Sequence, residues 1–170
     1  MSVVEKFKLV VNDNGGERSI DEMLSVKLLE LHRLSSRLSL LDAHDALFLL
    51  KNCFSILKLT YTMRSAPCYE LQLLSDYDDV LRTSLQLILN IQLTDVVWEQ
   101  ATLPVASGGI GIRKATQVAL PAFLSSVAKV EPLISELLPD RLQAVAGTKD
   151  PLFRLAVEVW CTQVDSAPVQ

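Results

Sequence analysis

Hydrophobic residues recur at helical spacing along most of this chain. In the first such segment the leucines stand three or four positions apart, which places them on one face of a helix. These leucines are Leu24, Leu28, Leu31, Leu34 and Leu38. Ser19 precedes this face and Glu22 follows at the spacing of a capping box, so the pattern predicts that a helix begins near residue 20.

The same reasoning predicts four more long helices. Asp42 is suited to cap the second helix, which continues with a bend toward Arg64 and ends before Pro67. The apolar residues between Val80 and Ile91 cover more than one helical face, so the third helix is expected to be central. The predicted helices lie near residues 20–40, 42–64, 76–91, 113–130 and 151–163.

Local signals mark the ends of the other elements. Thr94 is placed to cap a short helix, and Asp150, followed directly by a proline, predicts the start of the last one. Pro121 lies inside the fourth helix, where it predicts a kink. We expect Pro132 and Pro139 to divide the segment that follows into short pieces.

The sequence therefore predicts an all-α fold, a single helical domain of about five to seven helices. A length of 170 residues is natural for one domain. Residues 5–11 alternate loosely before a turn signal at 12–16, so they form either one short strand or a tail. The predicted organisation is a tail or short strand over 1–18, a helical domain over 19–165 and a tail over 166–170.

The charge balance argues against a generally basic nucleic-acid-binding surface. The chain has 20 acidic and 16 basic residues and a net charge of -4, so contact with phosphate must come from a local patch. The candidate residues are Lys51, Lys58, Arg64, Arg113 and Lys114. Lys51 and Lys58 would share one face of an unbroken helix, and Arg113 and Lys114 open a helix whose free amides favour phosphate. A solvated surface is the commoner explanation for such charges.

A cluster of glycines suggests a phosphate-binding loop but does not fit one. Gly108, Gly109 and Gly111 are followed by Arg113 and Lys114. A P-loop needs a lysine followed by Ser or Thr, whereas an alanine follows Lys114. A dinucleotide loop needs a third glycine where Lys114 stands. We therefore interpret the glycines as a tight structural connection that needs a positive φ or close packing.

A cluster of acidic residues suggests the metal-binding carboxylates of a polymerase. Two-metal catalysis needs carboxylates that are held rigidly together, whereas Asp76, Asp78 and Asp79 lead directly into a predicted helix. Acids in a first helical turn complement the helix dipole, and Ser75 with Asp78 fits a helix cap. We interpret these acids as helix-start residues and expect no catalytic residue among them.

No metal or cofactor site is predicted. His32 and His44 lie on different predicted helices without a second ligand at zinc spacing. Cys53, Cys68 and Cys161 are widely spaced and odd in number, which favours reduced thiols and an intracellular location in the cytoplasm or nucleus. The longest run without a charged residue is too short to span a bilayer, so no membrane partner is expected.

Three blocks of the sequence together resemble a known protein family. They are 43-AHDALFLLKNCFSILKLTYTMRSAPC-68, 77-YDDVLRTSLQLILN-90 and 98-WEQATLPVASGGIGIRKATQVALPAFLSS-126. In order and spacing they are similar to the region just downstream of the palm in reverse transcriptases of non-LTR, LINE-like retrotransposons. The resemblance covers residues 20–140 and implies a helical, thumb-like region in which the glycines connect two helices. Leu57 stands where the family has a proline, which favours a straighter helix.

The resemblance implies descent from an RNA-directed DNA polymerase without implying its activity. The fingers, the palm and its metal-binding acidic motif have no counterpart in the sequence, so we expect this chain not to be an enzyme. Two classes of function remain open. The first is a weak nucleic-acid-binding module that contacts an RNA–DNA template–primer duplex or a separate polymerase palm. The second is a structural or protein-interaction domain, self-associating through apolar surface, or an inert remnant of a degraded element.

Overall fold

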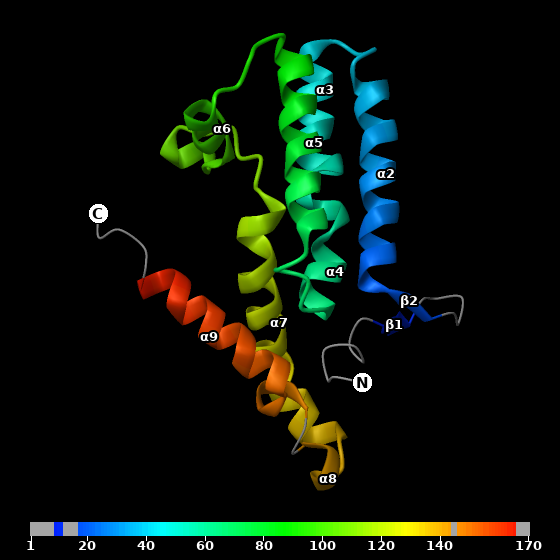
Figure 1. Cartoon of the computed structure of the whole chain (residues 1–170), viewed down its shortest axis with the longest axis vertical. Coiled ribbons are helices and arrows are strands. Elements are labelled where there is room, and N and C mark those ends of the chain that lie inside the picture. The colour runs from blue at the N-terminus through cyan, green and yellow to red at the C-terminus, as the bar shows by residue number, and fades with distance from the viewer. Residues whose placement is uncertain (1–8, 12–16, 144–145, 166–170) are drawn as a thin grey trace.

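The computed structural model describes residues 9–11, 17–143 and 146–165, and its fold is all-α, as the sequence predicts (Figure 1). Two short strands precede the helices where the sequence allowed one. They are β1 (Leu9–Val11) and β2 (Glu17–Ser19), which pair antiparallel. The turn predicted at 12–16 and the tail predicted at 166–170 lie outside the described residues.

The helices are α2 (Ile20–Leu38), α3 (Ala43–Leu49), α4 (Thr60–Ser65), α5 (Gln72–Leu89), α6 (Asp95–Thr102), α7 (Ala115–Leu137), α8 (Asp140–Gln143) and α9 (Pro151–Asp165). They form an upright bundle, and α7 continues below it toward α8 (Figure 1). In the bundle α2 packs along α5, with α3 beside α5, while α4 packs against α7 and α9 crosses the lower half of α7. Shorter turns of helix are η1 (Leu50–Phe54), η2 (Ile56–Lys58), η3 (Val105–Ser107) and η4 (Gly147–Lys149).

The main hydrophobic core lies inside the bundle and reaches the start of α7. Leu31, Leu50, Leu74 and Leu81 are among its fully buried side chains, and Ile112 extends it to the segment just before α7. A separate, smaller cluster joins α7 to α9. The buried residues of this smaller cluster are Leu120, Phe123 and Ala156.

The local capping predictions are confirmed at the starts of three helices. The hydroxyl of Ser19 accepts a hydrogen bond from the amide of Glu22 (3.1 Å) at the start of α2. Thr94 caps α6, and the carboxylate of Asp150 accepts from the amide of Leu152 (2.8 Å) at the start of α9. Asp42 stands at the N-cap position of α3 but makes no side-chain capping hydrogen bond there.

The helix predicted over 42–64 is interrupted in its middle. Residues 50–54 form a π-helical turn, the backbone leaves the helical region at Ser55 (φ -74°, ψ -147°), and α4 starts only at Thr60. The hydroxyl of Tyr77 donates to the carbonyls of Phe54 (3.1 Å) and Ser55 (3.2 Å). The break occurs although residue 57 is a leucine and no proline interrupts the segment. The Tyr77 hydroxyl of α5 provides a donor for carbonyl groups that the interrupted helix leaves free.

Two other predicted boundaries are wrong. The third helix, α5, begins at Gln72 and not near residue 76, so Ser75 lies inside it and caps nothing. The fourth helix, α7, runs to Leu137 and contains both Pro121 and Pro132, so Pro132 does not divide the segment. Pro139 does follow the end of α7, because the residue before a proline is biased away from helical geometry.

Candidate functional site

The start of α7 is capped by a carboxylate from a different helix. Asp78 of α5 is only 5% exposed and accepts hydrogen bonds from the backbone amides of Ala115 (2.6 Å) and Thr116 (3.1 Å). The hydroxyl of Thr116 donates a further hydrogen bond to the same carboxylate (2.7 Å). Burial raises the pKa of Asp78 above its usual value, while the Thr116 hydroxyl, the two amides and Lys114 oppose that rise. This contact joins α5 to α7 in the interior.

The same contact corrects our interpretation of the acidic cluster. Because α5 begins at Gln72, the three acids lie beyond its first turn and are not helix-start residues. Asp76 accepts from the side chain of Gln72 (3.2 Å), Asp78 is directed inward to α7, and Asp79 is exposed. In the part of the chain that the structure describes, no three His, Cys, Asp or Glu side chains are grouped so that they could hold a metal ion.

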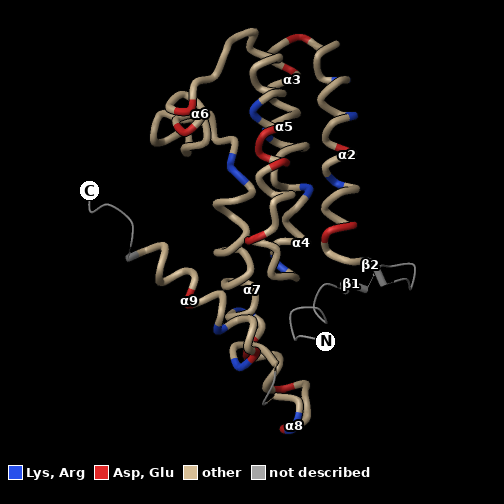
Figure 2. The backbone as a smooth tube through the Cα atoms, viewed as in Figure 1, with Lys and Arg blue, Asp and Glu red and all other residues tan. Residues whose placement is uncertain are grey.

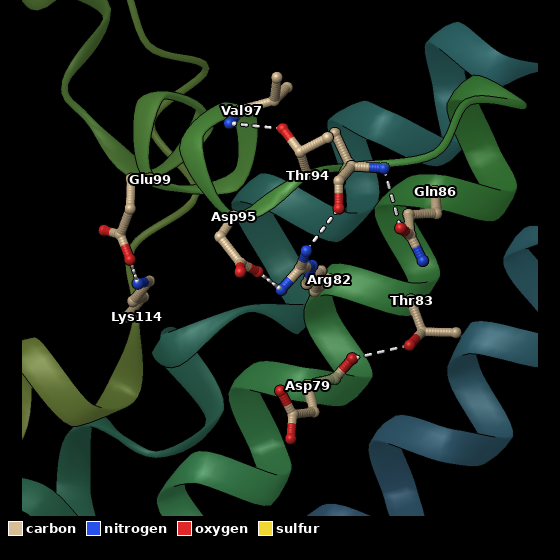
Figure 3. Close-up of polar contacts among 10 residues, drawn as sticks. Asp79, Arg82, Thr83, Gln86, Thr94, Asp95, Val97, Glu99 and Lys114 are labelled. Atoms are coloured by element: carbon tan, nitrogen blue, oxygen red, sulfur yellow. Dashed lines mark hydrogen bonds and ion pairs between the residues drawn. The ribbon is translucent and has the colours of Figure 1, made fainter.

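Polar side chains of α5 hold the connection to α6. The guanidinium of Arg82 pairs with Asp95 (2.7 Å) and also donates to the carbonyl of Leu93 (Figure 3). The side-chain oxygen of Gln86 accepts from the amide of Leu93 (2.9 Å). Asn90 ends α5 with a left-handed conformation (φ 51°), which asparagine tolerates better than most residues. The position of α6 relative to α5 is therefore fixed by both backbone geometry and side-chain contacts.

Lys114, which we predicted to contact phosphate, is engaged inside the protein. Its ammonium forms an ion pair with Glu99 of α6 (Figure 3). It also lies 6.0 Å from the ring centroid of Trp98. The side chain of Lys114 is only 14% exposed. A cation with a carboxylate and an aromatic ring as partners is already compensated, which makes Lys114 less available to phosphate than the other four candidates.

The glycine loop is the tight connection that the sequence predicts. Gly108 and Gly111 have φ values of 80° and 81°, which favour glycine. A Cβ atom on Gly109 would overlap the carbonyl oxygen of Leu103, so a close backbone approach requires glycine there. The amides of residues 108–111 all donate to carbonyl groups of residues 101–105. The loop therefore has no free amide for a phosphate group, and its role is structural.

The expectation that free backbone amides at the start of α7 favour phosphate is also wrong. We expected free backbone amides after Arg113 and Lys114, because the first amides of a helix have no partner within it. In the structure Asp78 accepts from the amides of both Ala115 and Thr116. The negative charge at this helix start is therefore supplied by the protein itself.

The remaining four cations have no ion-pair partner among the described residues. Lys51 is half-buried beside the glycine loop, with its Nζ 3.3 Å from where a Cβ of Gly111 would lie. Lys58 and Arg64 are exposed on η2 and α4. Because the helix is interrupted between Lys51 and Lys58, the argument that these two share one helical face does not apply.

Arg113 is exposed and lines a hollow of about 400 Å³ between the end of α6 and the first half of α7. Figure 2 shows that basic and acidic positions are interspersed along the backbone and are not gathered in one part of it. The four cations belong to four different segments, η1, η2, α4 and the loop before α7, and so provide separate points of contact.

The cysteines are free thiols in the structure. Cys53 and Cys161 are exposed, whereas Cys68 is buried, and burial raises the pKa of its thiol to about 11. A thiol with so high a pKa is protonated at neutral pH and unreactive. Cys68 therefore acts as a core residue.

Sequence reasoning missed the partners that position the junction of α5, α6 and α7. The residues involved are Asp78, Arg82, Gln86, Trp98 and Glu99. A signal for one of them was present, because Asp78 lies three or four positions from Leu74 and Leu81 and so on the apolar face of the helix. An acid on an apolar face predicts a buried partner, since an unpaired buried carboxylate is costly.

No protein-family model, curated protein or solved structure matches this chain. In the described part of the chain one helix, α7, is long and apolar enough to cross a membrane by length and composition alone. The charge-free run on which we based the expectation of no membrane span ends before Lys129, whereas α7 continues through Lys129 and Glu131. In this structure α7 packs against α4, α5 and α9.

Proposed function

We propose that this chain is a helical, thumb-like nucleic-acid-binding module that holds the backbone of an RNA–DNA template–primer duplex and performs no chemistry of its own. The observation that carries the proposal is that residues in each of the three sequence blocks contact residues in the other two. The hydroxyl of Tyr77 satisfies the carbonyl of Ser55, Asp78 caps α7, and Lys51 lies against Gly111. The residues that mark the resemblance are thus residues that hold one helical unit together.

The charges of the described surface support weak binding that does not depend on base sequence. Lys51, Lys58, Arg64 and Arg113 are the cations most available to phosphate, and Lys114 is less available. Four phosphate contacts correspond to a logarithmic salt dependence of about -3 to -4 on a duplex. The net charge of -4 works against tighter binding, so we expect dissociation constants of about 10⁻⁴ to 10⁻⁶ M at physiological salt.

The arrangement of the acidic residues supports the second half of the proposal. Asp76 accepts from Gln72 and Asp78 accepts from the start of α7, while Asp79 is exposed. Among the described residues these acids form no group of three that could hold a metal ion, as two-metal catalysis would require. We expect no primer extension by this chain in the presence of Mg²⁺ or Mn²⁺. Extension that disappears in Asp79→Ala would contradict this.

Fluorescence anisotropy with a labelled blunt-ended RNA–DNA hybrid tests binding. Charge removal in Lys58→Gln and Arg113→Gln should weaken binding, and each should reduce the salt slope by about one. Lys129→Gln is the matched control, because Lys129 is an exposed lysine of α7 outside the proposed set. Absence of binding by the unaltered protein at low salt would refute the proposal, as would an equal effect of all three substitutions.

A protein-interaction role is the second candidate, favoured by the outer surface of α6 and the turn that follows it. Four large aliphatic side chains are exposed on this segment: Val96, Val97, Leu103 and Val105. Exposed apolar groups that lie close together mark interaction sites more often than isolated ones do. Light scattering coupled to size-exclusion chromatography distinguishes the roles, because self-association through this segment should be lost in Val96→Ser and Val105→Ser.

A further inference from the structure

A hollow on the outer side of α4 combines features that none of its residues shows alone. Its volume is about 540 Å³, and it lies between the η2–α4 segment and the middle of α7. It is lined by Leu57, Thr60, Tyr61, Arg64, Ser65 and Ser126. None of these residues is acidic, so the one charge in the lining is the positive charge of Arg64.

Tyr61 and Arg64 lie three positions apart on α4 and therefore on the same side of the helix. Tyr61 is 70% exposed, which leaves the face of its ring open to solvent. Arg64 is also exposed and forms no ion pair with any described residue. Asp150 lines an adjoining hollow together with Arg64, but its carboxylate caps α9 instead. The pair thus presents an aromatic face and an uncompensated guanidinium to the same space.

The hydroxyl groups of the lining can contact the polar edge of a ligand. The hydroxyls of Thr60 and Ser65 donate to helix carbonyls, to Ile56 (3.1 Å) and Tyr61 (2.8 Å) respectively, which leaves their oxygens available as acceptors. The hydroxyl of Ser126 makes no hydrogen bond within the described structure and can donate. Leu57, 58% exposed, adds apolar surface beside the ring.

We propose that this hollow binds one unpaired nucleotide, with its base stacked on Tyr61 and its phosphate paired with Arg64. An aromatic face suits any base, because every base has a π-face, and a guanidinium pairs with phosphate through two parallel hydrogen bonds. The inference rests on the proposed function, because the nucleotide is the one that extends the template strand beyond the duplex. It adds a single-strand contact to a module otherwise assigned only to duplex backbone.

Two RNA–DNA hybrids with a one-nucleotide template overhang test the inference, one with a base and one abasic at the overhang. The two ligands carry the same phosphates, so any difference in affinity reports on the base. The unaltered protein should bind the hybrid with the base at least about fivefold more tightly, the lower end of base–aromatic stacking. With 2-aminopurine as the overhanging base, binding should also quench its fluorescence.

Substitutions at the hollow assign the effect to Tyr61. Tyr61→Leu should abolish both the affinity difference and the quenching, whereas Tyr61→Phe should preserve them because the ring remains. Phe48→Leu is the matched control, since Phe48 is an exposed aromatic residue of α3 outside the hollow, and it should change neither. Arg64→Gln should weaken binding of both hybrids, and Arg64→Lys should restore part of the loss.

The outcomes separate this inference from the proposed function. If the blunt-ended hybrid binds and the overhanging base adds nothing, or adds the same in Tyr61→Leu, the nucleotide site is refuted and duplex binding stands. If the blunt-ended hybrid does not bind but a single strand binds in a manner that depends on Tyr61, duplex binding is refuted and the site stands. Absence of binding to any of these ligands overturns both. Because Tyr61 contributes little buried surface, its substitutions should leave the fold unchanged. Circular dichroism of each variant checks this.

Discussion

The two ends of helix α7 are held by the same kind of contact in opposite surroundings. At its start, the buried carboxylate of Asp78 accepts three hydrogen bonds from Ala115 and Thr116. Toward its other end, the half-exposed carboxylate of Glu131 accepts one hydrogen bond from the amide of Thr148 (2.8 Å). Both contacts join α7 to a distant part of the chain, but only the first lies in the hydrophobic core.

The packing along α7 follows the same division. Ala115 and Ala119 belong to the main core, whereas Leu133 and Leu137 are exposed, Leu137 by 74%. Local stability follows the density of buried apolar contacts, so the start of α7 is expected to open less often than its end. Lys51 and Arg113 lie near this well-packed start, which suits the proposed phosphate contacts, because a rigid support holds contacting side chains in a defined geometry.

Glycine substitutions should give the largest difference between the two ends. Gly109→Ala places a Cβ against the backbone carbonyl of Leu103, which cannot move without disrupting the loop, and we expect a loss of about 3 kcal/mol of unfolding free energy. At Gly147 the nearest atoms are the ends of the Glu131 and Ile134 side chains, which can move, so Gly147→Ala should cost about 1 kcal/mol, mainly for its φ of 61°. Urea unfolding measures both. Equal losses would show that the glycine loop is no more rigid than the far end.

Removal of the two carboxylates tests the comparison directly. Asp78→Ala removes the acceptor for the buried amide of Ala115 and the part-buried amide of Thr116, and should destabilise the protein by about 3 kcal/mol. Glu131→Ala frees an amide that water can reach, so its cost should be about 1 kcal/mol or less. Asp79→Ala serves as the control on α5, because this carboxylate is exposed to solvent, and its effect should stay within about 0.5 kcal/mol. A loss in Asp79→Ala as large as that in Asp78→Ala would refute the capping role.

The titration of Asp78 should change the free energy of unfolding by less than the substitutions described above. Because the pKa of Asp78 is raised from 3.8 in the folded protein, mainly by burial, the folded chain holds a proton that the unfolded chain has already lost. The stability from this group is fully present below the unfolded pKa and is lost as the pH rises through the folded pKa, at about 1.4 kcal/mol for each pH unit between the two pKa values. Thermal unfolding of the protein and of Asp78→Asn across this pH range measures the difference. A difference that grows in the protein's favour with rising pH would contradict the sign.

The candidate site was predictable only in part. The glycine loop was identified from its residues, because positive φ values and close approach restrict a position to glycine regardless of context. The partners of Lys114 were not predictable, because a lysine in the sequence carries no sign of the carboxylate and aromatic ring that engage it, the carboxylate fifteen positions away. Tyr61 was overlooked because an aromatic residue at helical spacing usually belongs to the core, and only the structure shows that it is exposed.

The sequence by itself determined the all-α class and the helix starts at Ser19, Thr94 and Asp150. Each of these helix starts depends on residues two or three positions apart, which meet whenever the backbone turns into a helix. The tertiary structure alone decided the break in the helix over 42–64 and the cap on α7. These depend on Tyr77 and Asp78, which act on groups between 22 and 38 positions away. Local spacing cannot specify such contacts, because they form only after α5 is packed between the segments it joins.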